Sequence, residues 1–150
     1  MLKKATLEDA QKIHRLINTF ARERLMLGRS LNYIYDRIRD FWVYKEKNRV
    51  LGCCSLNIVG WQDLAEIKSL AVDKKHQKKG LGKALVKISL KEAKELGIKK
   101  VFVLTYESAF FKKFGFKTVS KDKLPHKIWA DCLNCPEFPA CKEEALIRKI

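Results

Sequence analysis

Hydrophobic and polar positions divide the chain into strand-like and helix-like segments. A helical spacing of three to four residues first appears at Ile13, Leu16, Ile17 and Phe20. Thr6 and Asp9 precede this run with the spacing of a capping box, so we expect a helix from there to about Leu25. A second helical pattern begins after Ser30, whose hydroxyl can cap it. Two helices are therefore predicted after a short first strand at 3–5.

Short apolar runs bounded by turn residues predict the remaining strands. We expect them at 41–44, 50–56, 64–72 and 100–105, with one more after Phe116. A helix over 81–96 ends at Gly97, because glycine is the residue that most often follows a helix C-terminus. A short helix is predicted over 108–114. The expected order is β-α-α-β-β-β-α-β-α-β.

Length and composition limit the class of protein. The 150 residues fit one domain with a sizeable core. Apolar runs long enough to span a membrane are absent from the sequence, and the first residues turn polar and acidic at once, unlike a signal peptide. We therefore expect a cytoplasmic protein. The formal charge of +15 favours anionic partners such as coenzyme A, acidic substrates or nucleic acid, and does not choose among them.

The segment 65–85 carries the most specific chemical signal. It reads as a buried strand, a short basic loop and then Gln77-x-x-Gly80-x-Gly82 at the start of an amphipathic helix. The first amides of a helix have no intrahelical partner, and the helix dipole makes this end partially positive. Glycines let such amides approach an anion without a Cβ in the way. The segment therefore predicts a site for a phosphorylated ligand.

Two common nucleotide motifs do not fit this segment. A Walker loop requires a serine or threonine directly after its lysine, whereas Ala84 follows Lys83 here. A dinucleotide fingerprint requires a third glycine at a spacing that is not found after Gly82. The segment instead resembles the coenzyme A pyrophosphate loop of the GCN5-related N-acetyltransferases, the GNAT superfamily.

This resemblance implies an α/β (α+β) fold, a mixed central sheet flanked by helices, with residues 1–150 forming one acetyltransferase domain. It implies acetyl-coenzyme A as co-substrate, with its pantetheine arm pairing to strand backbone at Leu70 and Val72. The residues implied to hold the pyrophosphate, mostly through backbone amides, are Gln77, Lys78, Lys79, Gly80, Leu81, Gly82 and Lys83.

Amine acetylation also needs a base, and Glu66 is the first candidate. Period-two alternation puts Glu66 on the same strand face as Lys68, Leu70 and Val72. In the resembled family, a carboxylate at this position often acts as a base through water. The alternative is an ordinary surface glutamate paired with a lysine. A catalytic acid is harder to assign, because the family often uses a tyrosine where this chain has Phe111.

The nearby hydroxyls are Tyr106 and Ser108, and Ser108 could instead cap a helix. Departure of the thiolate can also proceed without an acid from the protein. We therefore take Glu66, Tyr106 and Ser108 as the catalytic candidates and leave the choice between the two hydroxyls open.

Further segments resemble the acetyltransferase domain of bacterial N-acetylglutamate synthases, which begin arginine biosynthesis. They are 25–31, 65–72, 101–106 and 124–129. The resemblance implies L-glutamate as acceptor, with Arg29 and Lys127 gripping its carboxylates. The chain begins directly at this domain, as in the short form of the family. We therefore expect no arginine regulation through a kinase-like domain.

Alternatives to glutamate acetylation remain at this point. A GNAT enzyme could act on another small amine or on a protein N-terminus, and acidic residues lining the acceptor cleft would favour that activity. A basic module that binds nucleic acid with the same fold is a third possibility. A homodimer is compatible with the sequence, and a membrane partner is not expected.

The five cysteines fall into two groups. Cys132, Cys135 and Cys141 have part of the spacing of a metal knuckle but lack a clear fourth ligand, so no metal site is assigned; a disulfide or free thiols are the alternatives. Cys53 and Cys54 lie in a strand pattern. We expect at least one of them to be an ordinary core residue.

Overall fold

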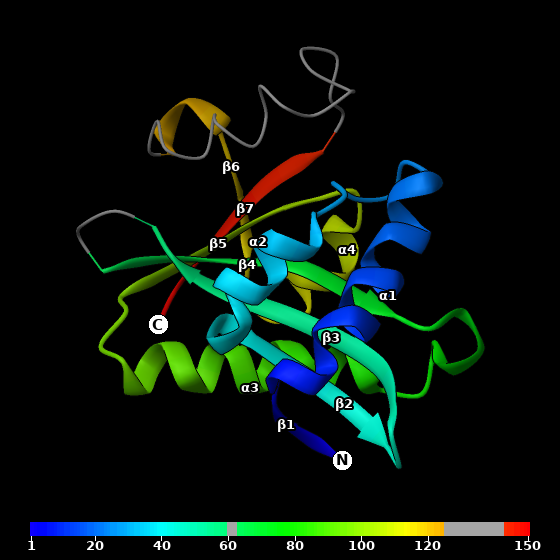
Figure 1. The fold of residues 1–150 in the computed structure, drawn as a ribbon. Helices are drawn as coiled ribbons and strands as arrows, with labels where there is room; N and C mark the ends of the chain where they lie inside the picture. Colours follow the sequence, from blue (N-terminus) through cyan, green and yellow to red (C-terminus); the bar gives the residue numbers. More distant parts are fainter. Residues whose placement is uncertain (60–62, 125–142) are drawn as a thin grey trace. The chain divides into compact units, whose positions relative to one another are not determined.

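The computed structural model describes residues 1–59, 63–124 and 143–150. The chain divides into two compact units, one formed by 1–56 with 67–92 and the other by 57–66 with 93–150. Strand β4 (Leu64–Val72) contributes to both units. Hydrogen-bonded strands follow the order β1-β2-β3-β4-β5-β7-β6 (Figure 1). The sheet is mixed because β4 and β5 pair in parallel, whereas β1 with β2, β2 with β3, β5 with β7 and β6 with β7 pair antiparallel.

The first unit begins with the elements that the sequence pattern indicates. They are β1 (Leu2–Lys4), a 3-10 turn (Leu7–Asp9), α1 (Ala10–Arg22), α2 (Leu31–Asp36), β2 (Phe41–Glu46) and β3 (Arg49–Ile58). The predicted capping box is present, since the Thr6 amide donates to Asp9 Oδ2 at 2.8 Å. Ser30 caps α2 by accepting from the Tyr33 amide at 3.1 Å. Helix α1 ends before the expected Leu25, and Arg24 has a left-handed φ of 59°.

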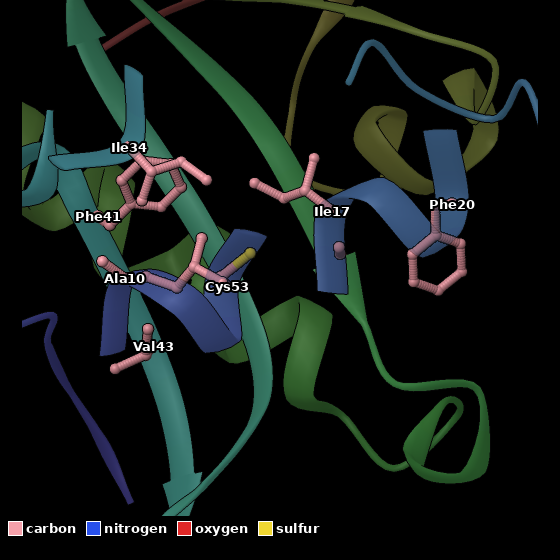
Figure 2. Close-up of a cluster of buried hydrophobic side chains, with 9 residues drawn as sticks. Ala10, Ile17, Phe20, Ile34, Phe41, Val43 and Cys53 are labelled. Atoms are coloured by element: carbon pink, nitrogen blue, oxygen red, sulfur yellow. The ribbon is translucent and has the colours of Figure 1, made fainter. Parts of the chain in front are cut away.

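Strand alternation gives this part of the sheet two apolar faces. Val43 pairs with Cys53 in the β2–β3 register, and both belong to a buried cluster with residues of α1 and α2. Figure 2 shows Ile34 of α2 beside Phe41 of β2, with Ile17 of α1 nearby. Helices α1 and α2 therefore cover the sheet face on which Phe41, Val43 and Cys53 lie.

The neighbouring positions on β2 and β3 point to helix α3 (Leu81–Glu95). Trp42 and Cys54 form the next register pair. The Trp42 indole donates to Glu92 Oε1 at 2.9 Å, and Ser89 Oγ lies 3.6 Å from Cys54 Sγ. Since Glu92 and Ser89 both belong to α3, this helix covers the face opposite α1 and α2. The expectation of helices on both faces is confirmed in this unit.

The second unit is built around β5. Its other elements are the first residues of β4, α4 (Ser108–Lys112), β6 (Lys117–Val119) and β7 (Glu144–Lys149). Strand β5 spans Lys100–Thr105 as predicted, and β7 pairs antiparallel with both β5 and β6. The sequence pattern missed β7, because Ala145, Leu146 and Ile147 form only a short apolar run between charged residues. Buried Phe102 and Ala145 belong to the core of this unit.

Candidate active site

The loop between β4 and α3 has the backbone expected of an anion site. Gly80 has a φ of 85° and Lys78 a φ of 66°, so two alternate residues adopt the left-handed region. The Ala84 amide donates to the Gly80 carbonyl at 3.0 Å, which makes it the first helical bond of α3. The amides of Leu81 to Lys83 therefore precede the helical ladder, where an anion can accept from them. Lys78, Lys79 and Lys83 are exposed around this point.

Gln77 closes this loop onto the end of β4. Its side-chain amide donates to the Val72 carbonyl at 3.0 Å. Asp73, the next residue after the strand, accepts from the Lys75 amide at 3.2 Å and anchors its own amide on the Leu51 carbonyl. The Gln77 side chain thus shapes the loop. Lys74 is paired with Glu23, the residue directly after α1.

Parallel pairing between β4 and β5 covers only the start of β4. The recorded register ends at Glu66 with Phe102, while β4 continues to Val72. Beyond that pair, Leu70 and Val72 are partly exposed and alternate with buried neighbours. Ser69 has a left-handed φ of 56°, which is unusual within a strand and marks a local irregularity in β4. Leu70 and Val72 therefore stay the predicted contacts of the pantetheine arm.

Glu66 lies at the last recorded β4–β5 pair and is only 6 % exposed. A carboxylate at such a buried position is unlike the surface glutamate of the alternative interpretation, since acidic side chains are rarely buried without a specific environment. Lys68 follows two residues later on the same strand and is partly buried. Glu66 therefore remains the base candidate.

The two candidate acids follow β5 in the same unit as Glu66. Tyr106 is 41 % exposed and comes directly after the strand. Ser108 is the first residue of α4, whose N-cap is Glu107, so the capping alternative for Ser108 is not what the structure shows. The Glu107 amide is instead held by the Thr105 hydroxyl at 2.8 Å. Phe111 is buried and packs edge-on against Phe116, so it has a core role.

Arg29 sits on a loop that α1 holds in place. The Asn18 side-chain amide donates to the Arg29 carbonyl at 2.9 Å and to the His14 carbonyl at 2.8 Å. Gly28 packs so closely against this amide that a Cβ added to it would lie 2.7 Å from Asn18 Oδ1. Arg29 then directly precedes Ser30, the cap of α2. Its backbone is thus fixed from both sides.

Three cationic groups converge on the ring of Tyr33 in α2. The Arg29 guanidinium carbon lies 4.6 Å from the ring centroid. The Arg37 guanidinium carbon and the Lys68 Nζ atom each lie 5.7 Å from it. The sequence had suggested Arg29 alone of these groups. Tyr33 and Lys68 were missed, because their meeting depends on how α2 packs on β4. The alternation of side chains along β4 puts Lys68 on the same strand face as Glu66, so this sequence pattern could have identified Lys68 as a site candidate.

Several candidates lie outside the described residues. They are Lys127, the second glutamate ligand, and the tail cysteines Cys132, Cys135 and Cys141. Within the described ranges, His, Cys, Asp and Glu side chains form no group of three that could hold a metal. Cys53 and Cys54 are fully buried, as expected of core residues, and burial raises the pKa of both thiols.

Comparison with known proteins identifies the class. Residues 7–116 match the model of the acetyltransferase (GNAT) family. An uncharacterised N-acetyltransferase of Chlorobaculum tepidum is 42 % identical over 149 residues, which cover 99 % of this chain and 96 % of that protein. An amino-acid acetyltransferase of Mycobacterium tuberculosis is 34 % identical over 122 residues, covering 79 % of this chain and 69 % of the relative.

A solved structure is also similar over almost the whole chain. It is the N-acetylglutamate synthase of Neisseria gonorrhoeae in complex with coenzyme A and N-acetylglutamate, with a TM-score of 0.89 and 27 % identity. The match covers 99 % of this chain and 34 % of that protein, so this chain spans about a third of its length. The chain belongs to the GNAT family and is an N-acetyltransferase with acetyl-coenzyme A as co-substrate. The expected fold is thereby confirmed. No helix in the described ranges has the length and apolarity needed to span a bilayer.

Proposed function

We propose that this protein transfers the acetyl group of acetyl-coenzyme A to the α-amine of L-glutamate, the N-acetylglutamate synthase reaction that begins arginine biosynthesis. The observation that carries the proposal is the fixed position of Arg29 within a group of cations around Tyr33. A guanidinium held in this position can pair with a carboxylate of the acceptor, which a cationic acceptor such as a polyamine lacks. The named relatives support the same assignment.

Acetyl-coenzyme A would bind along β4 and the loop after it. The amides at the start of α3 would donate hydrogen bonds to the pyrophosphate oxygens, with Lys78, Lys79 and Lys83 adding positive charge around them. The pantetheine arm would pair with the backbone at Leu70 and Val72, beyond the last β4–β5 pair. The Val72 carbonyl already accepts from the Gln77 side chain, and a carbonyl oxygen can accept a second hydrogen bond.

The acetyl transfer itself would be direct. The neutral amine attacks the thioester carbon, the new C–N bond forms and the C–S bond breaks, and coenzyme A leaves as a thiolate. Glu66 would take the amine proton through a water molecule. The thiolate would gain a proton from Tyr106, from Ser108 or from solvent. Holding the amine and the thioester together supplies much of the rate enhancement in such a reaction.

The substrate pocket would use Arg29 for one carboxylate and Lys127 for the other. A guanidinium suits this task, because its planar fork of donors matches the two oxygens of a carboxylate. The Asn18 bond and the close approach of Gly28 support this role, since they fix the backbone from which the Arg29 side chain extends.

The test is thiol release from acetyl-coenzyme A with L-glutamate, L-aspartate, L-glutamine, spermidine or no acceptor. We expect release with L-glutamate, lost in Arg29→Ala and retained in Arg15→Ala, which removes an exposed arginine of α1. Glu66→Gln should lower kcat by about a hundredfold or more, since general bases typically contribute that much. Preference for another acceptor would refute the glutamate assignment and leave the family intact.

A further inference from the structure

The thiol of Cys53 in β3 contacts the backbone of β4 inside the first unit. Cys53 is fully buried in the cluster of Figure 2, and its Sγ lies 3.4 Å from the Ser69 carbonyl oxygen, to which the thiol donates. Burial raises the pKa of this thiol, and a backbone hydrogen bond from Ala71 partly opposes that effect. One side chain of β3 thus contacts β4 on both sides of Leu70.

Ser69 is the point where β4 departs from regular strand geometry. Its φ of 56° lies in the left-handed region, which a residue with a Cβ enters at a cost in energy. Such a conformation persists only where the surrounding structure holds it in place. Ser69 is itself buried, and its carbonyl accepts from the equally buried Cys53 thiol. The thiol is therefore placed to hold this part of β4, which we call the Ser69 kink.

A contact with β3 shows which way the backbone groups after the Ser69 kink point. The Asp73 amide, directly after β4, donates to the Leu51 carbonyl of β3 at 2.8 Å, so Asp73 faces β3. Along a strand, the N–H and C=O groups of one residue point to one edge, and those of the next residue point to the opposite edge. Leu70 and Val72 therefore direct their N–H and C=O groups to the edge of β4 away from β3.

We propose that Cys53 is a positioning residue for acetyl-coenzyme A, because its thiol holds the Ser69 kink from which Leu70 and Val72 present their backbone to the pantetheine arm. The inference rests on the pantetheine contact of the proposed function and adds a residue of the neighbouring strand to it. Hydrogen bonds weaken steeply when donor and acceptor are misaligned, so the angle of the β4 backbone matters. Cys53 acts through that backbone and takes no part in the chemistry.

Two variants of Cys53 separate the hydrogen bond from the packing. Cys53→Ala removes the donor, so the buried Ser69 carbonyl loses a hydrogen bond, whereas Cys53→Ser keeps a donor at this position. We expect the dissociation constant of coenzyme A to rise about fivefold in Cys53→Ala and to stay within about twofold of the wild type in Cys53→Ser. Equilibrium titration without an acceptor measures both values, so the identity of the acceptor does not enter.

The next residue of β3 supplies the matched control. Cys54 is also fully buried, but its Sγ lies 3.6 Å from Ser89 Oγ of α3, on the opposite face of the sheet. Cys54→Ala removes the same atoms from the core and should lower the melting temperature without changing the dissociation constant of coenzyme A. Equal losses of affinity in Cys53→Ala and Cys54→Ala would overturn the inference, because they would reflect general damage to the core.

The effect of Cys53→Ala should also depend on the pantetheine arm. The fragment 3′-phospho-ADP is the part of coenzyme A that lacks this arm and keeps the phosphates. Cys53→Ala should leave its dissociation constant unchanged, as in a double-mutant cycle whose second change is the removal of the arm. The same loss of affinity for both ligands would show that the thiol does not act on the arm, and would overturn the inference.

Amide hydrogen exchange in the wild type tests the same geometry, whether or not the variants fold. In the free protein the Ala71 amide should exchange slowly, because it faces β3 and the buried sulfur, and the Leu70 amide should exchange faster. Coenzyme A should slow exchange at Leu70 and change that at Ala71 little. An Ala71 amide that exchanges as fast as the Leu70 amide in the free protein would overturn the inference.

The outcomes separate this inference from the proposed function. If L-glutamate is not acetylated and Cys53→Ala still weakens the binding of coenzyme A selectively, the glutamate assignment fails and the inference stands. If L-glutamate is acetylated and Cys53→Ala binds coenzyme A as tightly as the wild type does, the function stands and the inference fails. Binding of coenzyme A that leaves exchange at Leu70 unchanged would refute the pantetheine contact, and the inference with it.

Discussion

Asn18 of α1 holds the backbone of Arg29 through a 2.9 Å hydrogen bond from its side-chain amide to the Arg29 carbonyl. The same amide donates to the His14 carbonyl, so one side chain joins the middle of the helix to the loop before α2. Helix α1 is itself anchored by the buried side chains of Ile13 and Ile17. Rigidity in the core is thereby transmitted to the residue that we propose binds the acceptor.

The first prediction follows from this bond. Asn18→Ala should raise the KM for L-glutamate about fivefold, because an ordinary intramolecular hydrogen bond contributes about 1 kcal/mol. The KM for acetyl-coenzyme A should not change. Steady-state kinetics with each substrate varied in turn measure both values. Thr19→Ala, which removes an exposed hydroxyl bonded to the Arg15 carbonyl on the same helix, is the control. Equal effects of the two variants would contradict a positioning role for Asn18.

Gly28 should tolerate a methyl group only when Asn18 is shortened. In Gly28→Ala the new Cβ would lie 2.7 Å from Asn18 Oδ1 and 3.3 Å from the Ala21 Cβ, so the Asn18 side chain has to move. We expect lower thermal stability and a raised KM for L-glutamate. The double variant Gly28→Ala with Asn18→Ala should be no worse than Asn18→Ala alone, since the clash is removed. Additive losses in the double variant would show that the clash lies elsewhere.

Gly80 and Gly97 provide a matched pair for testing the anion loop. Both have a φ of 85°, and an added Cβ at either would meet no atom within 4 Å. Alanine at each should therefore cost a similar amount of stability, about 1 kcal/mol or somewhat more, from left-handed backbone strain alone. Gly80→Ala should in addition raise the KM for acetyl-coenzyme A.

Gly97 ends α3, where its amide bonds to the Lys94 carbonyl, far along the helix from the loop. Gly97→Ala should therefore leave the KM for acetyl-coenzyme A unchanged while showing the same loss in thermal unfolding. A raised KM in both variants, or in neither, would refute the role given to the loop.

Cys53 and Cys54 should be inert to thiol reagents in the native protein. Burial raises the pKa of Cys54 to about 12, with a partial opposing effect of the Ser89 hydrogen bond, and burial raises that of Cys53 as well. The reactive thiolate is therefore scarce at neutral pH, and access is blocked. Alkylation followed by peptide mapping should find both unmodified until the protein is unfolded. Rapid native labelling of either would contradict their burial.

The sequence predicted the parts of this fold that depend on local pattern. Strands β4 and β5 fall at the expected residues because their apolar runs are bounded by clear turn signals. The loop before α3 was predicted from its two glycines at the start of a helix, and Gly80 does adopt a positive φ in the structure. Strand β7 was missed because its pairing with β5 is long-range and its apolar run is short.

The acceptor site was only partly predictable for the same reason. Arg29 was found through the resemblance to the N-acetylglutamate synthases. Lys68 could have been found from the sequence, because it lies two residues from Glu66 and on the same strand face. Tyr33 meets them only because α2 packs over the sheet through Ile34, and no sequence spacing encodes that approach. Gln77 was expected near phosphate, yet its side chain serves the loop by binding the Val72 carbonyl.

The ion pair between Asp9 and Lys45 predicts how stability depends on pH. Asp9 is fully buried, and its Oδ1 lies 2.7 Å from Lys45 Nζ. Burial alone would raise the pKa of Asp9, but hydrogen bonds from Lys45 and the Thr6 amide, with the charge of Lys45, outweigh it and lower the pKa below 3.8. A carboxyl group with a lowered pKa in the folded state stabilises the protein above its unfolded pKa.

The stabilisation by Asp9 should thus be complete at neutral pH and decline only as the pH falls below about 3.8. Asp9→Asn should lower the unfolding free energy by about 3 kcal/mol at pH 7, since it leaves Lys45 largely buried without its partner. Denaturant unfolding at a series of pH values measures the difference from wild type, which should shrink in acid. Glu8→Gln removes a neighbouring exposed carboxylate and should change little at any pH. A difference for Asp9→Asn that grows as the pH falls would show that the sign of the pKa shift is wrong.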